Sequence, residues 1–317
     1  MTAELSSAPA VLFRPQTAWR VRWNMNTDTP LPPDEAAGEN PPDGAMIDYY
    51  VGAKARGELT LEVKDEKGNT VRRYSSTDPV VAPDATLAIP RYWVRPSQQL
   101  SSEPGMHRFL WDLHYTPIPG AAPQYPIAAV YMNTAPASTS PWAMPGKYTA
   151  VLTIGGKSYS QPFSIAMDPR VKTSTADLSE QFKLSRQIYD QLISVAKTAE
   201  SARQVREQLD AIRSQLPEGE LKKELNSVTE KMQLFGGTAA PTGARTLGLT
   251  TGRLRSLFAQ IEGVDLAPTS QIISATAETI KDAHDLEESW KTFASADLPA
   301  LNSKLKAAGL ATIKIPN

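Results

Sequence analysis

The sequence contains no cysteine and only three histidines among its 317 residues. The absence of cysteine excludes disulfide bonds, thiolate metal sites and cysteine nucleophiles. No segment has the roughly 18 to 20 consecutive apolar residues that a membrane-spanning helix needs. The formal net charge of −1 gives the chain no overall field that attracts nucleic acid or an anionic membrane. We therefore expect no membrane span, no nucleic-acid partner and no cysteine chemistry.

Common catalytic and nucleotide-binding motifs are also missing. The sequence has no G-x-S-x-G, no H-E-x-x-H and no G-x-G-x-x-G. The segment GGTAAPTG at positions 236–243 contains glycine but lacks the Gly-Lys-Ser/Thr ending of a phosphate-binding loop. We predict no catalytic residue, no cofactor-binding residue and no metal ligand.

The amino-terminal residues MTAELSSAPAVLF do not have the pattern of a signal peptide. An acidic residue stands where basic residues are needed, and no apolar segment follows. The chain is therefore expected to be cytoplasmic, or else a mature form or an excised piece of an exported protein.

Proline is abundant, with 26 residues, most of which lie before Pro169. This first half alternates apolar and polar residues over short segments that predict β-strands. The segments are Ala18–Asn24, Met46–Val51, Glu58–Lys64, Thr70–Ser75, Leu87–Val94, Met106–Tyr115, Lys147–Ile154 and Lys157–Ala166. Gly68 is available for a hairpin turn between two of them. About eight strands with no helix between them favour an antiparallel β-sandwich of the immunoglobulin-like or fibronectin-like kind.

The second half has a helical period instead. Apolar residues recur at steps of three and four, which places them on one face of a helix: Leu192, Val195, Ala199, Ala202, Val205, Leu209, Ile212 and Leu216. Asp177, followed by Glu180, is a candidate amino-terminal cap of this long helix. Further helices are predicted around Leu221–Phe235, Leu254–Ile261 and Ile272–Phe293, and a last one follows a cap at Asp297. The pattern predicts an antiparallel helical bundle, so the fold class is α+β with two domains.

The two patterns meet at Asp168-Pro169, because proline cannot donate to a strand ladder and restricts the residue before it. Four ranges follow. Residues 1–45 are expected to supply amino-terminal strands and a proline-rich segment that packs on the sandwich. Residues 46–168 form the sandwich, residues 171–310 the bundle, and residues 311–317 a tail.

Asp112 and His114 share one face of a predicted strand and could form an acid–base pair of the kind that a hydrolase uses. The alternative is a polar pair on the solvent face, with His107, Trp111 and Tyr115 pointing inward, together with Phe109 and Leu113. His284 lies on a charged helix face and is expected to be solvated. We favour the structural alternative at all three histidines.

Five acidic residues lie in the proline-rich segment Thr27–Ala45, namely Asp28, Asp34, Glu35, Glu39 and Asp43. Their spacing is not that of an EF-hand calcium loop. A glycosidase needs two carboxyl groups roughly 5–10 Å apart across a cleft, which sequence spacing does not establish. An ordered surface loop is the default interpretation. Trp93, Trp111 and Trp142 could stack on sugar rings, but tryptophan in a sandwich more often belongs to the core.

Three segments together resemble a known family. They are DTPLPPDEAAGENPPDGAMIDYYVG (Asp28–Gly52), GMHRFLWDLHY (Gly105–Tyr115) and PGKYTAVLTIGGKSYSQPFSIAMDPRV (Pro145–Val171). They are similar to the carboxyl-terminal region of large bacterial β-propeller proteins with neuraminidase-type or sortilin-like repeats, which are often labelled glycosyl hydrolases. The closing segment Asp297–Leu310 is similar to the end of that family.

The resemblance implies a propeller followed by an immunoglobulin-like sandwich and helices. This chain has no propeller and no Ser/Thr-x-Asp-x-Gly-x-x-Trp repeat, so no catalytic residue of that family has a matching position here. What the resemblance implies is a periplasmic or extracellular location and an accessory or scaffolding role.

Three functions remain open. The first is a non-catalytic module that packs against a β-propeller or another protein. The second is a carbohydrate-binding accessory region of a sialidase-like glycoside hydrolase system, with exposed tryptophans. The third is an enzyme that uses Asp112, His114 and loop carboxylates, which requires these groups to converge in a cleft.

Overall fold

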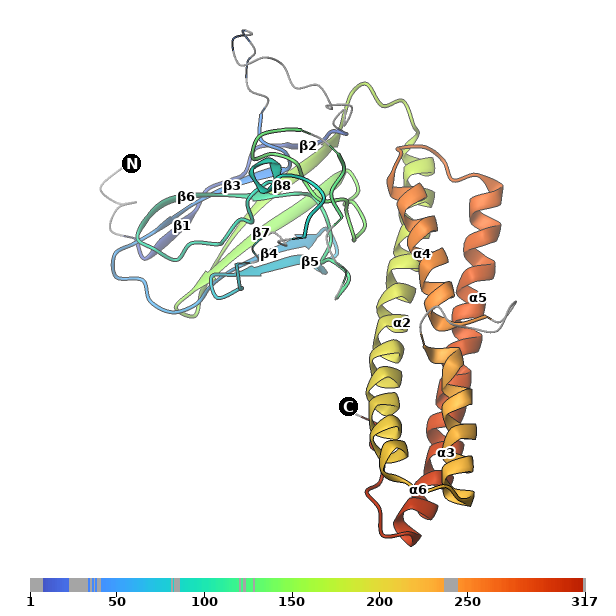
Figure 1. Cartoon of the computed structure of the whole chain (residues 1–317). Coiled ribbons are helices and arrows are strands. Elements are labelled where there is room, and N and C mark those ends of the chain that lie inside the picture. Colours follow the sequence, from blue (N-terminus) through green and yellow to red (C-terminus); the bar gives the residue numbers. More distant parts are fainter. Residues whose placement is uncertain are drawn as a thin grey trace. The chain divides into compact units, whose positions relative to one another are not determined.

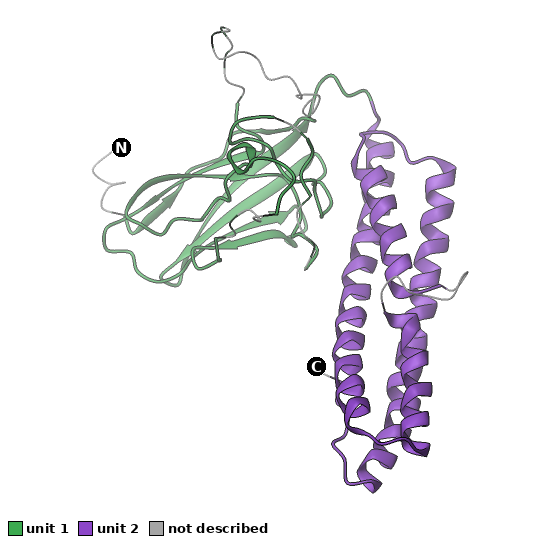
Figure 2. Ribbon diagram, viewed as in Figure 1, with its two compact units in different colours: residues 1–172 green, residues 173–317 purple. Residues whose placement is uncertain are grey.

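A computed structural model describes residues 8–22, 34, 36, 38, 41–80, 82, 86–119, 121, 124–127, 129–236 and 245–315. Contacts divide the chain into two compact units, Met1–Lys172 and Thr173–Asn317 (Figure 2). The first unit contains β-strands and the second contains helices (Figure 1). The expected α+β class is therefore confirmed, and the last strand ends at Met167 while the first long helix begins at Thr175.

The β unit has two sheets. The three-stranded sheet has the order β1-β3-β6, with β1 at Ala10–Leu12, β3 at Ala45–Val51 and β6 at Gly105–Trp111. The five-stranded sheet has the order β2-β8-β7-β4-β5. Its strands are β2 (Ala18–Arg20), β4 (Leu59–Asp65), β5 (Thr70–Ser75), β7 (Gly146–Ile154) and β8 (Lys157–Met167). The expectation of purely antiparallel pairing is wrong, because β2 runs parallel to β8 and the isolated bridge between Val94 and Thr134 is also parallel.

Two hairpins hold the five-stranded sheet in register. Between β4 and β5, the Asp65 carboxylate accepts hydrogen bonds from the backbone N–H groups of Lys67 and Asn69, at 2.9 and 2.8 Å. Gly68 has a φ of 83°, the left-handed conformation that glycine adopts at no steric cost. The turn between β7 and β8 likewise uses positive φ angles at Gly155 and Gly156. The turn at Gly68 confirms the hairpin predicted there.

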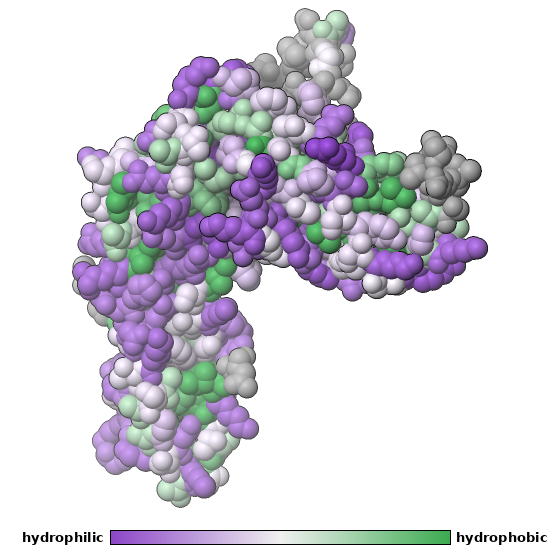
Figure 3. All heavy atoms as spheres, turned by 180° about the vertical axis from the view of Figure 1, so that it is seen from behind, coloured by the Kyte–Doolittle hydropathy of each residue, from purple (hydrophilic) through white to green (hydrophobic). Residues whose placement is uncertain are grey.

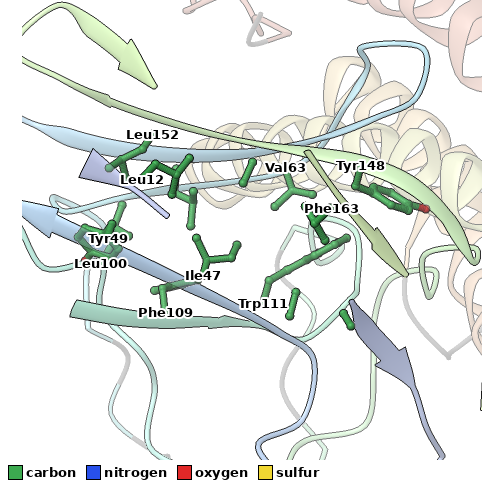
Figure 4. Packing of buried hydrophobic residues seen from close by; sticks show 14 of the residues in the cluster. Leu12, Ile47, Tyr49, Val63, Leu100, Phe109, Trp111, Tyr148, Leu152 and Phe163 are labelled. Carbon is green, nitrogen blue, oxygen red and sulfur yellow. The ribbon is translucent and has the colours of Figure 1, made fainter. Parts of the chain in front are cut away.

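Side chains from both sheets contribute to one hydrophobic core (Figure 4). Trp111 is fully buried, and its ring centroid lies 5.8 Å from that of Tyr148 in β7 and 6.2 Å from that of Phe163 in β8. Ile47, on the neighbouring strand β3, is also fully buried. Strict alternation of buried and less buried residues along β3 is what a strand with one face on the core requires.

The helical unit contains α2 (Thr175–Gln215), α3 (Glu220–Lys231), the 3₁₀ segment η2 (Met232–Phe235), α4 (Leu247–Glu262), α5 (Ser270–Thr292) and α6 (Leu298–Ala307). A π-helical segment, η3 (Phe293–Asp297), joins α5 to α6. Helices α2, α4 and α5 pack against one another. A second group of contacts joins α2, α3, η2 and α6 around buried residues that include Met232, Leu301 and Leu305. In the described part of the chain, no helix has the length and apolar character to cross a membrane.

Three local predictions are wrong. Leu87–Val94 is not a strand, and it contains only a short 3₁₀ helix at Arg91–Trp93 and a bridge at Val94. The cap of α2 is Ser174, whose hydroxyl accepts from the N–H of Asp177, so Asp177 lies inside the helix. Asp297 caps nothing, because its backbone is helical and its carboxylate pairs with Lys231 at 2.6 Å.

Candidate functional site

Asp112 and His114 do lie close together, but a backbone turn holds them. Leu113 has a φ of 61°, which is unusual for a residue with a side chain. The Asp112 carboxylate accepts the backbone N–H of His114 at 3.1 Å. The Nδ1 atom of His114 lies 2.8 Å from the Asp112 carbonyl oxygen and 3.9 Å from its carboxylate. A carbonyl can only accept, so Nδ1 carries the proton, and the backbone rather than the carboxylate orients the ring.

The same turn ends β6 at Trp111, four residues before the predicted end at Tyr115. The backbone N–H of Ala143 donates to the carbonyl of Leu113 at 2.7 Å, and the N–H of Tyr115 donates to Pro141 at 3.0 Å. The Trp111 indole N–H donates to the carbonyl of His114 at 2.9 Å. These contacts fasten the turn to a neighbouring segment and to the core.

Trp142 lies beside this turn, and its ring is already in contact with polar groups. The His114 imidazole stacks on it, with centroids 5.3 Å apart and an interplanar angle of 7°. The guanidinium carbons of Arg20 and Arg22 lie 4.5 and 4.8 Å from the indole centroid. Arg20 is itself buried and donates to the carbonyl of Ala143 at 3.2 Å. Such cation–π contacts stabilise a packed cluster and leave Trp142 unsuited to stacking on a sugar.

The other candidate residues are in structural positions. His107 is half-buried, with its ring 5.2 Å from that of buried Tyr49 and its Nε2 2.7 Å from the carbonyl of Glu103. His284 is on the surface of α5, 3.6 Å from the carboxylate of Glu287. Trp111 belongs to the core, and Trp93 is partly exposed.

Of the five acids in the proline-rich segment, Asp28, Glu35 and Glu39 lie outside the described residues, and Asp34 is exposed. Asp43 pairs with Arg95, whose Nε also donates to Asn133 at 2.9 Å. The described residues contain no group of three or more histidine, aspartate or glutamate side chains that could hold a metal ion.

Two backbone-paired segments of the β unit expose Arg91, Tyr92, Tyr131 and Met132, residues that the sequence did not single out and that are here called the tyrosine surface. Tyr92 is 62% exposed, Tyr131 73% and Met132 46%. Its two segments are joined by a backbone hydrogen bond of 2.9 Å from Met132 to the carbonyl of Tyr92. The sequence gives a weak signal for it, because a Tyr-Met pair in a proline-rich loop is uncharacteristic of a solvated connection.

A groove of about 420 Å³ lies on the helical unit beside η3. Its apolar lining comes from Leu234, Phe235 and Phe293, and Lys231 and Asp297 pair at its edge. Pro299 explains the π-helical turn, since its ring would collide with the carbonyl four residues earlier and it lacks an N–H. On the face shown in Figure 3, hydrophobic residues of both units form separate groups among hydrophilic ones.

Comparisons with known proteins give no family. No protein-family model matches the chain, and no curated protein matches it. A solved structure described as pT26-6p aligns with 78% of this chain and 46% of its own length, at 8% identity and a TM-score of 0.14. The chain thus spans less than half of that structure, and a TM-score this low supports no statement about fold or function.

Proposed function

We propose that the chain is a non-catalytic accessory or scaffolding module of an exported bacterial β-propeller protein. The observation that supports this most strongly is the Asp112–His114 turn. The residues that come nearest to an acid–base pair are oriented by backbone groups, and the imidazole is stacked on Trp142. Such an arrangement stabilises a chain reversal.

The finer architecture belongs to the same proposal. The β unit is proposed to be an immunoglobulin-like sandwich, which the core shared by the three-stranded and five-stranded sheets supports. The helical unit is proposed to be an antiparallel bundle, which the mutual packing of α2, α4 and α5 supports. Two self-contained cores provide rigid surfaces, which is what a scaffolding role requires.

The propeller and the export of the protein are proposed from the resemblance of Asp28–Gly52, Gly105–Tyr115 and Pro145–Val171 to the carboxyl-terminal region of propeller proteins. The tyrosine surface agrees with a docking role. It lies next to Arg95, which pairs with Asp43 at the end of the proline-rich segment.

Carbohydrate binding is the second candidate function, favoured by the exposure of Tyr92 and Tyr131. The tryptophans that motivated it weaken it, because Trp111 is buried and Trp142 is stacked. Asp43 and the side-chain oxygen of Asn133, which could hold sugar hydroxyls, are engaged by Arg95.

The coding sequence around this chain tests the proposal. We expect a β-propeller to be encoded immediately upstream, in the same reading frame or in an adjacent one. The purified propeller and this chain should then form a complex that survives gel filtration, or fractionate together in the periplasm. A neighbourhood without a propeller, together with a cytoplasmic location, would contradict the proposal.

A further inference from the structure

The backbone that carries the tyrosine surface is ordered by hydrogen bonds between its two segments. Three backbone hydrogen bonds of 2.9 Å join residues Tyr92–Arg95 to residues Met132–Thr134. The N–H of Met132 donates to the carbonyl of Tyr92, the N–H of Thr134 to that of Trp93, and the N–H of Arg95 to that of Thr134. Trp93 packs edge-on against the Tyr92 ring, with centroids 6.3 Å apart. A surface whose backbone is already ordered loses little conformational entropy when a partner binds.

The composition of the surface favours a protein partner. Tyrosine, methionine and arginine are enriched where proteins bind proteins, and tyrosine and arginine dominate the binding energy at such sites. Neither tyrosine hydroxyl makes a hydrogen bond with the described residues, so both are available to a partner. The Met132 side chain is apolar and adaptable, which suits an irregular apolar side chain better than the flat face of a sugar.

The charges near the tyrosine surface favour a partner that carries an acidic group. Two arginines border the surface, and their environments differ. Arg95 is paired with Asp43 and Asn133, whereas Arg91 is exposed and makes no ion pair with any residue that the structure describes. An exposed guanidinium on the residue that precedes Tyr92 can attract a carboxylate of a partner bound at this surface, and arginine binds carboxylates with two parallel hydrogen bonds.

We infer that the tyrosine surface binds a segment of a partner protein in which an aromatic or aliphatic side chain stands next to an aspartate or glutamate. The apolar side chain packs on Tyr92, Tyr131 and Met132, and the carboxylate pairs with Arg91. This inference rests on the proposed function, because it gives the scaffolding module the surface through which it docks.

Synthetic peptides provide the probe. One set of fluorescent twelve-residue peptides places phenylalanine or leucine beside glutamate, and a matched set has lysine in place of glutamate. We expect the intact chain to bind members of the glutamate set, and to bind the corresponding lysine peptides with an affinity at least about tenfold lower. Fluorescence anisotropy measures both.

Variants then assign the site. The double change Tyr92→Ala and Tyr131→Ala should weaken binding by about tenfold or more, and Arg91→Ala should remove the preference for glutamate. Arg91→Lys should retain part of that preference. Arg14→Ala and Trp19→Ala, which alter exposed residues elsewhere on the β unit, should leave binding unchanged.

Four results would overturn the inference. They are a lack of binding to either peptide set, equal binding to both sets, binding that survives the tyrosine changes, and binding of neutral oligosaccharides in place of peptides. Self-association that the tyrosine changes abolish would identify a second copy of the chain as the occupant and overturn it as well. None of these results bears on whether the chain is an enzyme, which turnover assays decide separately.

Discussion

At the scale of single residues, two positions are held in the left-handed backbone region although they have side chains. Leu113 has a φ of 61° and Met132 a φ of 50°. Leu113 is buried, and its conformation lets β6 end in the turn that places His114 on Trp142. Met132 is half-exposed, so packing does not compensate for its strain. Strain at an exposed loop position agrees with a role in binding.

Replacing Met132 with glycine tests this strain. Glycine removes the steric cost of the left-handed conformation, so Met132→Gly should stabilise the β unit by up to about 1 kcal/mol. The matched control Met106→Gly alters a similarly exposed methionine in β6 and should destabilise by about 0.5–1 kcal/mol. Urea denaturation of the full chain measures both. Destabilisation by Met132→Gly as large as that of the control would show that the strain is absent.

Asp168 should make the stability of the β unit depend on pH. Arg170 lowers the pKa of this buried carboxyl below its ordinary value of 3.8, chiefly through side-chain hydrogen bonds of 2.6 and 3.0 Å, and the Arg170 backbone N–H adds to the effect. A lowered pKa means that the stabilisation is fully present above the unfolded pKa, about 3.9, and is lost as the pH falls through the folded value.

Asp168→Asn should therefore be less stable than the native chain at pH 7, and the difference should close as the pH is lowered below about 4. Urea denaturation between pH 7 and pH 2.5 measures the difference. A gap that stays constant over this range would show that the charge of Asp168 contributes nothing.

At the scale of the elements, the spacing of apolar residues predicted most of the strands and helices. An element that buries one face must repeat its apolar residues with the period of its backbone. The alternation in β3 and the three- and four-residue steps in α2 follow directly from one-sided burial. What the sequence could not predict depends on contacts between distant residues. Leu87–Val94 alternates like a strand, but its contacts with residues 132–134 amount to a single β-bridge, Val94 to Thr134, beside a short 3₁₀ helix. Strand β1 is three residues long and too short to show a period.

The same limit applied to the candidate site. The spacing of Asp112 and His114 correctly placed them together, but it could not show the left-handed turn at Leu113 that redirects both side chains. The stacking on Trp142 joins residues 28 positions apart in sequence, and the tyrosine surface joins residues about 40 apart. No local pattern contains such pairs.

A buried glutamine joins two helices. Gln181 in α2 is 5% exposed, and its amide donates to the carbonyl of Ile261, in the last turn of α4, at 2.6 Å, and to the carbonyl of Val264, just beyond that helix. Helix ends leave such carbonyls without intrahelical partners. Gln181→Ala should cost about 1–3 kcal/mol, because buried acceptors lose their donor.

Circular dichroism at 222 nm during urea denaturation follows the helical unit and measures this cost. The control Gln260→Ala alters an exposed glutamine of α4 and should change stability by less than about 0.5 kcal/mol. Equal effects of the two changes would show that the link between α2 and α4 is unimportant.

At the scale of the whole molecule, a chain of strands followed by a chain of helices provides two independent cores. The candidate acid–base pair forms a backbone turn, Trp111 is buried and Trp142 is stacked on His114. Among the residues that the structure describes, the most exposed aromatic side chains are those of Tyr131, Tyr92 and Trp19. This distribution agrees with the proposed non-catalytic role of the chain.

Turnover of glycosides is the direct test of this proposed role. The full chain is incubated at high concentration with aryl-glycoside and aryl-sialoside substrates, and product release is compared with that of Asp112→Asn and Asp34→Asn. We expect release no faster than in buffer for all three proteins, because glycoside cleavage needs two carboxyl groups held across a cleft. Hydrolysis above the buffer rate that disappears with Asp112→Asn or Asp34→Asn would contradict it.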